Sequence, residues 1–272
     1  MPELPEVETI ARGLNQRVRG DVIESVWLGN KPEPLKSTAE EIASLLESKS
    51  IKSVHRAGKH IVFDLSSSKN GSSAQTAQWI VHLGMTGSLR VSPPDAEIEK
   101  HTHAILKLSS GRELRFVDPR RFGRLSVIEE FEPPGAEPLQ ISFEDFAKLF
   151  RKRKTPIKSA LLNQKLLSGV GNIYADEALF RARIRPRRRA ASLTSDDLRR
   201  LHSSLKKVLN EAIRAGGSSI SDYVDANGDE GFFQLKHRVY GREGKPCLTC
   251  KAPIKRVVIA GRSSHYCPNC QK

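Results

Sequence analysis

The sequence predicts an α+β protein with more than one domain: an antiparallel β-sandwich with flanking helices, then a helical region, then a small cysteine-bearing hairpin. Three observations predict this order. The first half holds short β-rich segments with turn residues between them. The second half changes to helical periodicity. All four cysteines lie beyond residue 246. A chain of 272 residues is long enough for two modest domains with their own cores.

The N-terminal segment predicts an amphipathic helix that ends at Gly20. Its apolar residues are spaced three, four and four positions apart, so they share one helical face: Val7, Ile10, Leu14 and Val18. Glu6 and Glu8 fall in the first turn, where the helix dipole favours anions.

Strand-like segments follow this helix. They are HIVFDL (60–65), QWIVHL (78–83), HAILKL (103–108) and ELRFVD (113–118). The last two flank SSGR, which is a hairpin signal. The stretch SSSKNGSS (66–73) predicts a flexible polar loop.

The proline-rich stretch FEPPGAEPL (131–139) predicts an interdomain linker, beyond which the pattern becomes helical. The clearest helix is TSDDLRRLHSSLKKVLNEAIRAGG. Thr194 and Asp197 form a capping box at its start, and Gly216 and Gly217 end it. Its predicted buried face comprises Leu198, Leu201, Leu205, Val208, Leu209, Ala212 and Ile213.

The cysteines form two pairs, CLTC (247–250) and CPNC (267–270), with 16 residues between the pairs. This spacing is typical of a zinc site. The ligands would be Cys247, Cys250, Cys267 and Cys270. Four thiolates leave no open coordination position, so the zinc is expected to be structural. The alternatives are two disulfides or one redox pair, and a cytoplasmic chain disfavours disulfides.

The segment KRVVIAGRSSHY between the cysteine pairs predicts a strand-turn-strand hairpin with AGR at its tip. Arg262 would then be held on a rigid ribbon and aimed outward, which suits contact with a phosphate. An ordinary solvated turn arginine is the alternative.

The chain is strongly basic. It has 45 Lys and Arg against 31 Asp and Glu, for a net charge of +14, and its pI is about 9.8. Such a charge favours a polyanionic partner, with nucleic acid as the first candidate. The sequence contains neither a membrane-length apolar run nor a signal peptide, so we expect a cytoplasmic protein.

The N-terminus carries its own chemical possibility. Removal of Met1 would make Pro2 a free secondary amine, directly followed by Glu3. Such an amine can attack an electrophilic carbon and form a permanently cationic iminium, while the acid supplies a proton. Taken alone, Met-Pro-Glu is more often an ordinary chain start.

These motifs do not stand alone, because the chain resembles the bacterial formamidopyrimidine-DNA glycosylases in order along nearly its whole length. The resemblance rests on PELPEVET (2–9), RAGKH (56–60), HLGMTGSLR (82–90), EKHTH (99–103), DPRRFG (118–123), SGVGNIYADEALF (168–180), VYGREGKPC (239–247) and the C-terminal AGRSSHYCPNCQK.

The resemblance implies a domain order and an activity. Residues 1–131 would form the catalytic β-sandwich domain and 132–140 the linker. Residues 141–237 would form a helix-two-turns-helix domain with a lesion-recognition loop, and 238–272 a zinc finger. The family excises oxidised purines, chiefly 8-oxoguanine and formamidopyrimidines, and then cleaves the abasic strand by β,δ-elimination.

The resemblance also implies roles for four catalytic residues. Pro2 would be the nucleophile that attacks the sugar C1′ and forms a Schiff base. Glu3 would be the acid that assists opening of the sugar ring. Lys59 would act in β-elimination and grip a phosphate, and Arg262 would act in δ-elimination and phosphate binding.

Further residues match the family's DNA contacts. The expected DNA contacts are His101, Arg120, Arg153 and Asn172. A base inside a duplex must be extruded before chemistry, and the residues matching the wedge that fills the gap and probes the opposite base are Met85, Arg120 and Phe122. Asn172 is also expected to be the N-cap of its helix. Candidates for reading the damaged base are Glu6, Ser218 and Tyr223, the last two in the mobile loop 218–233.

The chain departs from the family pattern at three places. Arg153 stands where lysine is usual, and its guanidinium should keep the phosphate contact. The family's LGPEPL reads PGAEPL here, which could shift the linker geometry. RARIRPRRR (181–189) is more basic than is typical, and we expect a solvated face with extra nonspecific affinity.

Two rival functions remain open on the sequence. One is an endonuclease VIII-like glycosylase for oxidised pyrimidines, although that branch usually starts PEGPE. The other is a noncatalytic damage-binding protein. The expected partner is double-stranded DNA with oxidised bases or abasic sites, the expected state is a monomer away from membranes, and the expected location is the bacterial cytoplasm at the nucleoid.

Overall fold

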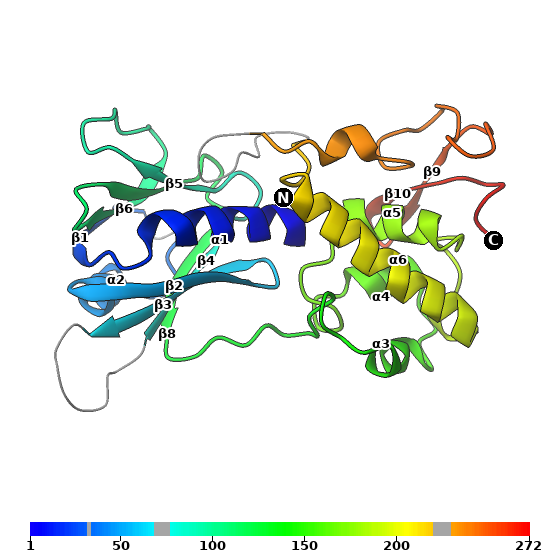
Figure 1. The fold of residues 1–272 in the computed structure, drawn as a ribbon, viewed down its shortest axis with the longest axis horizontal. Coiled ribbons are helices and arrows are strands. Elements are labelled where there is room, and N and C mark those ends of the chain that lie inside the picture. Colours follow the sequence, from blue (N-terminus) through cyan, green and yellow to red (C-terminus); the bar gives the residue numbers. More distant parts are fainter. Residues whose placement is uncertain (32–33, 68–76, 220–229) are drawn as a thin grey trace. The chain divides into compact units, whose positions relative to one another are not determined.

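The structure, a computed structural model, describes residues 1–31, 34–67, 77–219 and 230–272. The chain forms two compact units (Figure 1). The N-terminal unit comprises Met1–Glu132 and Gly216–Gly231, and the C-terminal unit comprises Pro133–Ala215 and Phe232–Lys272. Within the described residues, no helix is both long and apolar enough to span a membrane.

The N-terminal unit begins with helix α1 (Leu4–Val18), as the periodicity predicted. Its stripe of Val7, Ile10, Leu14 and Val18 is buried. The helix packs against strands β2 (Lys49–Ala57) and β3 (His60–Ser67). A second helix, α2 (Ala39–Leu46), starts with a capping box between Thr38 and Glu41.

Two antiparallel sheets follow, which confirms the predicted β-sandwich. In the first sheet the order is β1 (Ile23–Leu28), β6 (Thr102–Leu108), β7 (Glu113–Val117) and β5 (Ser88–Ser92). In the second it is β2, β3, β4 (Ala77–His82) and β8 (Arg124–Ile128). Apolar side chains from both sheets and both helices form one buried core, in which Phe63, Trp79 and Phe116 are the largest members.

All four strand-like segments seen in the sequence are strands. The segment 103–108 lies in β6 and 113–118 supplies β7, and the two pair antiparallel across the predicted SSGR turn. Most of the predicted polar loop 66–73 falls outside the described residues.

The C-terminal unit is mainly helical. Its helices are α3 (Phe143–Phe150), α4 (Ile157–Leu162), α5 (Asn172–Arg181) and α6 (Ser195–Arg214), with single 3-10 turns at η1 (Ala190–Ser192) and η2 (Phe233–Lys236). The predicted capping box of α6 is present. Gly216 and Gly217 follow its end with positive φ angles of 73° and 83°. The predicted apolar face is buried, except that Ile213 is only half-buried near the end of the helix.

The proline-rich segment packs into the C-terminal unit from residue 133 onward. The Ala136 N–H donates to the Leu166 carbonyl at 3.0 Å, and the Ser168 N–H donates back to the Ala136 carbonyl at 3.0 Å. Ala136 stands where the family pattern LGPEPL has proline, which has no N–H. This departure therefore adds a hydrogen bond to the segment.

Candidate functional site

The site in the N-terminal unit starts at the first turn of α1. Glu3 is the N-cap residue, with extended backbone, and it is buried. Its carboxylate accepts the Glu6 N–H, and Glu6 Oε2 accepts the Glu3 N–H at 2.8 Å, which completes a capping box. The half-buried Pro2 precedes it. The backbone and the side chain of Glu3 are thus both fixed next to Pro2.

The buried Glu6 carboxylate also reaches a distant part of the chain. Its Oε1 accepts the Ser218 N–H at 2.8 Å. A Cβ on Gly217 would lie 2.9 Å from Glu6 Oε1, so only glycine allows this approach. The structure therefore brings Glu3, Glu6 and Ser218 together. Tyr223, the other candidate for reading the base, lies outside the described residues.

Lys59 lies in the two-residue turn between β2 and β3, and it is buried. Gly58 before it has φ +62°, which suits a tight hairpin turn. The Arg56 guanidinium donates to Glu8 Oε2 at 2.8 Å and to the Gly58 carbonyl at 3.2 Å, so it ties this turn to α1. Burial raises the pKa of Glu8, but the charges and hydrogen bonds of Arg56 and Arg12 outweigh burial, and the pKa falls below its ordinary value.

Two histidines lie beside Lys59, and the sequence analysis missed them. The rings of His60 and His82 have centroids 4.9 Å apart. Burial lowers the pKa of both rings. It is the largest cause for His82, whose pKa falls to about 4, and positive potential from His60, Arg124 and Lys59 lowers that pKa further. His82 Nδ1 accepts the Gly84 N–H at 3.1 Å. His82 is therefore neutral at pH 7, and it fixes the start of the loop that carries Met85.

Asp118 connects the predicted wedge residues. Its carboxylate is fully buried. Oδ1 accepts hydrogen bonds from the Thr86 hydroxyl at 2.6 Å and from the Arg120 N–H at 3.3 Å. Oδ2 accepts a hydrogen bond from the Gly123 N–H at 2.7 Å. The Asp118 N–H donates to the His101 carbonyl at 2.9 Å. One carboxylate thereby joins the loop Leu83–Gly87, which carries Met85, to the loop Pro119–Gly123.

The wedge side chains themselves face solvent. Met85 is 43% exposed and Phe122 is 49% exposed. The Arg120 guanidinium lies 4.6 Å from the centroid of the Phe122 ring. A Cβ on Gly84 would lie 2.5 Å from the Phe122 backbone, so the two loops are in close contact. Exposed apolar side chains on a rigid support are suited to insertion into a partner.

In the C-terminal unit, Asn172 and Arg262 belong to neighbouring elements. Asn172 is the first residue of α5, and its N-cap is Gly171, so the predicted N-cap role of Asn172 is wrong. The Asn172 amide donates to Ser263 Oγ at 3.4 Å. Strands β9 (Lys255–Ile259) and β10 (Arg262–Tyr266) form the predicted hairpin, with Ala260 and Gly261 at positive φ in its turn. Arg262 is exposed.

A buried ion pair anchors this hairpin, and no pattern in the sequence predicted it. Lys158 Nζ donates to Asp176 Oδ1 at 2.6 Å and to the Ser263 carbonyl at 2.7 Å. Asp176 Oδ2 accepts the His265 N–H at 2.8 Å. Both charged side chains are fully buried. The backbone beside Arg262 is thus pinned to α4 and α5.

The arginine-rich segment 181–189 is not simply a solvated face. Arg185 donates to the carbonyls of Pro268 and Gln271, both at 2.9 Å. Arg181 pairs with Glu211 at 2.8 Å and Arg188 with Asp197 at 2.8 Å. These contacts hold the C-terminal segment and α6. The prediction of a solvated face is wrong for Arg181 and Arg188, which are partly buried, whereas Arg185 is exposed. Arg153, in contrast, is exposed in the loop between α3 and α4.

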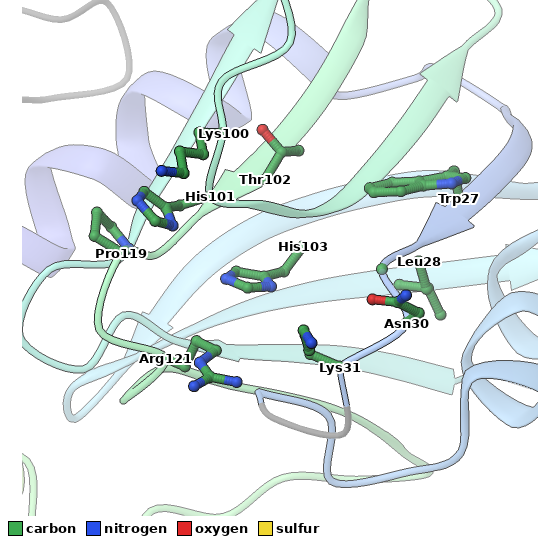
Figure 2. A pocket seen from close by; sticks show the side chains of 11 residues that line it. Trp27, Leu28, Asn30, Lys31, Lys100, His101, Thr102, His103, Pro119 and Arg121 are labelled. Atoms are coloured by element: carbon green, nitrogen blue, oxygen red, sulfur yellow. The ribbon is translucent and has the colours of Figure 1, made fainter.

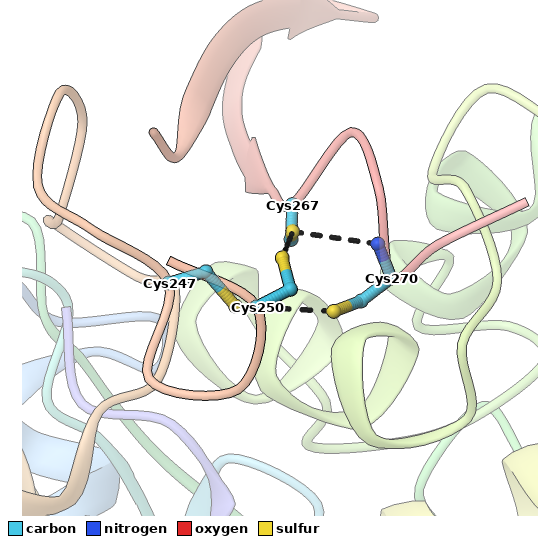
Figure 3. A group of neighbouring side chains, drawn as sticks. All are labelled: Cys247, Cys250, Cys267 and Cys270. Carbon is cyan, nitrogen blue, oxygen red and sulfur yellow. Dashed lines mark hydrogen bonds between the residues drawn. The ribbon is translucent and has the colours of Figure 1, made fainter. Parts of the chain in front are cut away.

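The four cysteines form a cluster suited to one metal ion (Figure 3). Their sulfur atoms all lie within 4.8 Å of one another. The Cys247–Cys270 and Cys250–Cys267 sulfur distances are 3.9 and 3.3 Å. Tetrahedral zinc with Zn–S bonds of about 2.3 Å requires sulfur separations of about 3.8 Å. The cysteines are free thiols, which excludes the disulfide alternative in this structure.

Comparisons with known proteins agree with this geometry. The family models that match are the formamidopyrimidine-DNA glycosylase N-terminal domain at residues 1–125, its H2TH domain at 134–224, and the zinc finger found in FPG and IleRS at 244–272. A formamidopyrimidine-DNA glycosylase of Solibacter usitatus is 48% identical, with all of both chains covered. The chain belongs to the formamidopyrimidine-DNA glycosylase family.

Solved structures of family members share the fold. The MutM (Fpg) protein of Thermus thermophilus has a TM-score of 0.86 at 43% identity, covering 99% of this chain and 98% of its own. Lactococcus lactis Fpg in complex with abasic-site DNA has a TM-score of 0.88 at 34% identity, covering 99% of each chain. As in the family's zinc finger, the four cysteines of this glycosylase hold one structural zinc.

Proposed function

We propose that this family member excises oxidised purines, chiefly 8-oxoguanine and formamidopyrimidines, from duplex DNA and then cleaves the abasic strand by β,δ-elimination. The main support is the geometry at the N-terminus. Glu3 directly follows Pro2, it is buried, and its N–H donates a hydrogen bond to the Glu6 carboxylate. Relatives named as formamidopyrimidine-DNA glycosylases support the activity. A Lactococcus lactis relative solved with Fapy-dG DNA supports the substrate.

The first step requires a free Pro2 amine, which removal of Met1 provides. The amine lone pair attacks the sugar C1′, and a C1′–N bond forms. The bond from C1′ to the base breaks, its electron pair leaves with the base, and the proton lost by the amine nitrogen passes to the departing base. Glu3 donates a proton to the ring oxygen O4′, which opens the sugar and leaves a cationic iminium on Pro2.

Strand cleavage follows from the iminium, which acts as an electron sink. Loss of a C2′ proton breaks the C3′–O bond and releases the 3′ phosphate, which is β-elimination. A second elimination removes the C4′ proton, breaks the C5′–O bond and releases the 5′ phosphate. Lys59 serves the first elimination, and Arg262 holds a phosphate and serves the second. Hydrolysis of the remaining imine regenerates the amine.

The other residues hold the substrate. The damaged nucleotide must leave the stack before the attack, and the wedge of Met85, Arg120 and Phe122 occupies the gap. Glu6 and Ser218 are assigned to reading the extruded base, and Tyr223, the third candidate, lies outside the described residues. Contacts to phosphates come from His101, Arg153 and Asn172, and they account for part of the affinity expected of a chain with net charge +14.

The partner is double-stranded DNA, and the protein acts as a monomer in the cytoplasm, at the nucleoid. The net positive charge and the relatives solved with Fapy-dG or abasic-site DNA support the DNA partner.

The proposal is tested with duplexes carrying 8-oxoguanine or thymine glycol, in the presence and absence of borohydride. We expect faster excision of 8-oxoguanine and a trapped adduct for the wild-type protein. Pro2→Gly should lose strand cleavage, and Glu3→Gln should bind DNA but not release the base. Preference for thymine glycol would instead indicate an endonuclease VIII-like enzyme, and absence of any adduct a noncatalytic binder.

A further inference from the structure

Two hollows in the described part of the chain differ in what they adjoin. The first has His101, Pro119 and Arg121 in its lining, so it adjoins the loop that carries part of the wedge (Figure 2). The second has a volume of about 930 Å³ and lies wholly in the C-terminal unit. None of its described lining residues is assigned above to catalysis or to DNA contact. We call this second hollow the arginine cavity.

Five arginines line the arginine cavity: Arg181, Arg183, Arg188, Arg200 and Arg238. Three of them already hold carboxylates. Arg181 pairs with Glu211 at 2.8 Å. The Asp197 carboxylate lies between Arg188, at 2.8 Å, and Arg200. A guanidinium group matches a carboxylate because it offers two parallel N–H donors. The contacts of these three arginines therefore indicate a carboxylate as the anion suited to this cavity.

Arg183 and Arg238 differ from the other three. Both are exposed, and within the described residues neither guanidinium forms an ion pair. The hydrogen bond from Arg181 is the main cause that lowers the pKa of Glu211, and Arg238 adds to this only through its charge at longer range. The backbone of Arg238 is fixed, because its N–H donates to both oxygens of Glu177 at 3.0 Å. The cavity thus keeps two arginines available for a ligand.

Arg183 also adopts a backbone conformation that favours glycine. It has φ +61° and directly follows Ala182, the C-cap of α5. Its N–H donates to the Phe180 carbonyl, and the Ile184 N–H donates to the Leu179 carbonyl, both at 3.0 Å. Glycine is the usual residue at this left-handed position after a helix. The backbone therefore does not explain an arginine here, whereas a role for its side chain in the cavity does.

The position of the cavity separates it from the expected DNA contacts of the same unit. Asn172 and Arg181 are the first and last residues of α5, about 14 Å apart at 1.5 Å per residue. Arg181 lines the cavity, whereas the Asn172 amide contacts Ser263, next to Arg262. A hollow of about 930 Å³ has the size of a site for a small ligand. It admits a short peptide segment and not a double helix.

We propose that the arginine cavity binds an acidic segment of another protein, with one carboxylate at Arg183 and a second at Arg238. A single exposed ion pair contributes little to binding, so the segment carries at least two carboxylates within a few residues. The side chains of Thr249 and Asn269 line the same cavity, and they offer hydrogen bonds to the backbone of such a segment. The glycosylase thereby engages a second protein while its DNA contacts are occupied.

The test measures the fluorescence anisotropy of labelled hexaglutamate mixed with the enzyme. The enzyme is first saturated with a duplex that carries a non-cleavable abasic-site analogue, so that the DNA contacts are covered. We expect saturable binding of hexaglutamate by the wild-type protein and none of labelled hexaglutamine. Arg183→Gly and Arg238→Ala should each weaken binding about threefold, the effect of one partly exposed ion pair. The double variant should weaken it about tenfold.

These variants are chosen to leave the fold intact. Glycine adopts φ near +61° without strain, so Arg183→Gly should not lower the Tm. Arg238→Ala keeps the N–H that donates to Glu177. The matched controls are Lys152→Gly, at an exposed residue with φ +63°, and Lys207→Ala, at an exposed residue of α6. Neither control residue lines the cavity, and both controls should bind hexaglutamate as tightly as wild type.

Three results would overturn the proposal. The first is no binding of hexaglutamate by wild type, or equal binding by wild type and both cavity variants. The second is loss of binding when DNA saturates the enzyme, because the peptide would then occupy the DNA contacts. The third is tighter binding of pyrophosphate than of hexaglutamate with the same dependence on Arg183, which would assign the cavity to a phosphate ligand. Excision of 8-oxoguanine by both cavity variants at the wild-type rate keeps this test separate from the proposed function.

Discussion

The Glu3 N–H donates a hydrogen bond to Glu6 Oε2 at 2.8 Å, so the residue proposed as the acid is held by the carboxylate three positions later. The other oxygen of Glu6 accepts the Ser218 N–H at 2.8 Å. One buried side chain therefore couples the start of α1 to Ser218, at the start of the predicted lesion-recognition loop. A capping box ordinarily only stabilises the start of a helix. Here the same Glu6 side chain also holds Glu3 and Ser218 in place.

Glu6→Gln tests this coupling. The carboxamide keeps the size of the side chain but has one accepting oxygen, so it cannot serve both N–H donors. A lost hydrogen bond to a charged group is worth about 1.5–3 kcal/mol, and we expect single-turnover excision of 8-oxoguanine to slow about tenfold or more. Glu41→Gln makes the same change in the capping box of α2 and should leave the rate unchanged. Equal rates for the two variants would contradict the coupling.

Asp118→Asn tests the support of the wedge. Asparagine offers one acceptor oxygen to donors from two loops, so Met85, Arg120 and Phe122 should lose their fixed arrangement. We expect the ratio of excision rates for 8-oxoguanine opposite cytosine and opposite adenine to move toward one. Circular dichroism should show that the fold is retained.

The matched control is Asp64→Asn. The Asp64 carboxylate lies on β3 in the second sheet, and it accepts hydrogen bonds from the side chains of Ser53 and Gln78. This variant should keep the wild-type ratio. If Asp118→Asn also keeps it, Asp118 does not position the wedge.

The histidine pair predicts a pH dependence of stability. The pKa of His82 is about 4 in the folded protein against 6.5 as its ordinary value, so the unfolded chain binds the extra proton. The contribution of His82 to the free energy of unfolding is complete above pH 6.5, and it is lost as the pH falls from 6.5 to about 4. The shift corresponds to about 3 kcal/mol. Urea unfolding at several pH values should show this loss, and His82→Asn should make it smaller but not abolish it, because burial also lowers the pKa of His237 to about 4.

Asparagine at position 82 can still accept the Gly84 N–H but does not titrate in this range. If the free energy of unfolding falls as steeply between pH 6.5 and 4 in His82→Asn as in wild type, the loss of stability belongs to other groups.

We expect removal of zinc to weaken DNA binding before it affects the folded structure of the N-terminal unit. The cysteine cluster and the Lys158–Asp176 pair hold the hairpin that carries Arg262. Chelation should therefore weaken binding to abasic-site DNA, and added zinc should restore it. Unchanged affinity after complete removal of the metal would refute the role of the hairpin in DNA binding.

Local patterns in the sequence predicted much of this fold. Helix α6 was readable from its capping box and apolar stripe, and the zinc site from its cysteine spacing. The contacts of Asp118 and the ion pair of Lys158 with Asp176 were not readable, because they join residues far apart in the chain through side-chain geometry. Asn172 shows the limit at a helix boundary: it was predicted to be the N-cap, and the structure has the N-cap one residue earlier, at Gly171.

The most direct test of the central claim is mass spectrometry of the borohydride-reduced adduct with 8-oxoguanine DNA. The account predicts that the deoxyribose is attached to the nitrogen of Pro2, in a chain that has lost Met1. Attachment to Lys59 or to any other residue, or an active enzyme that retains Met1, would contradict it.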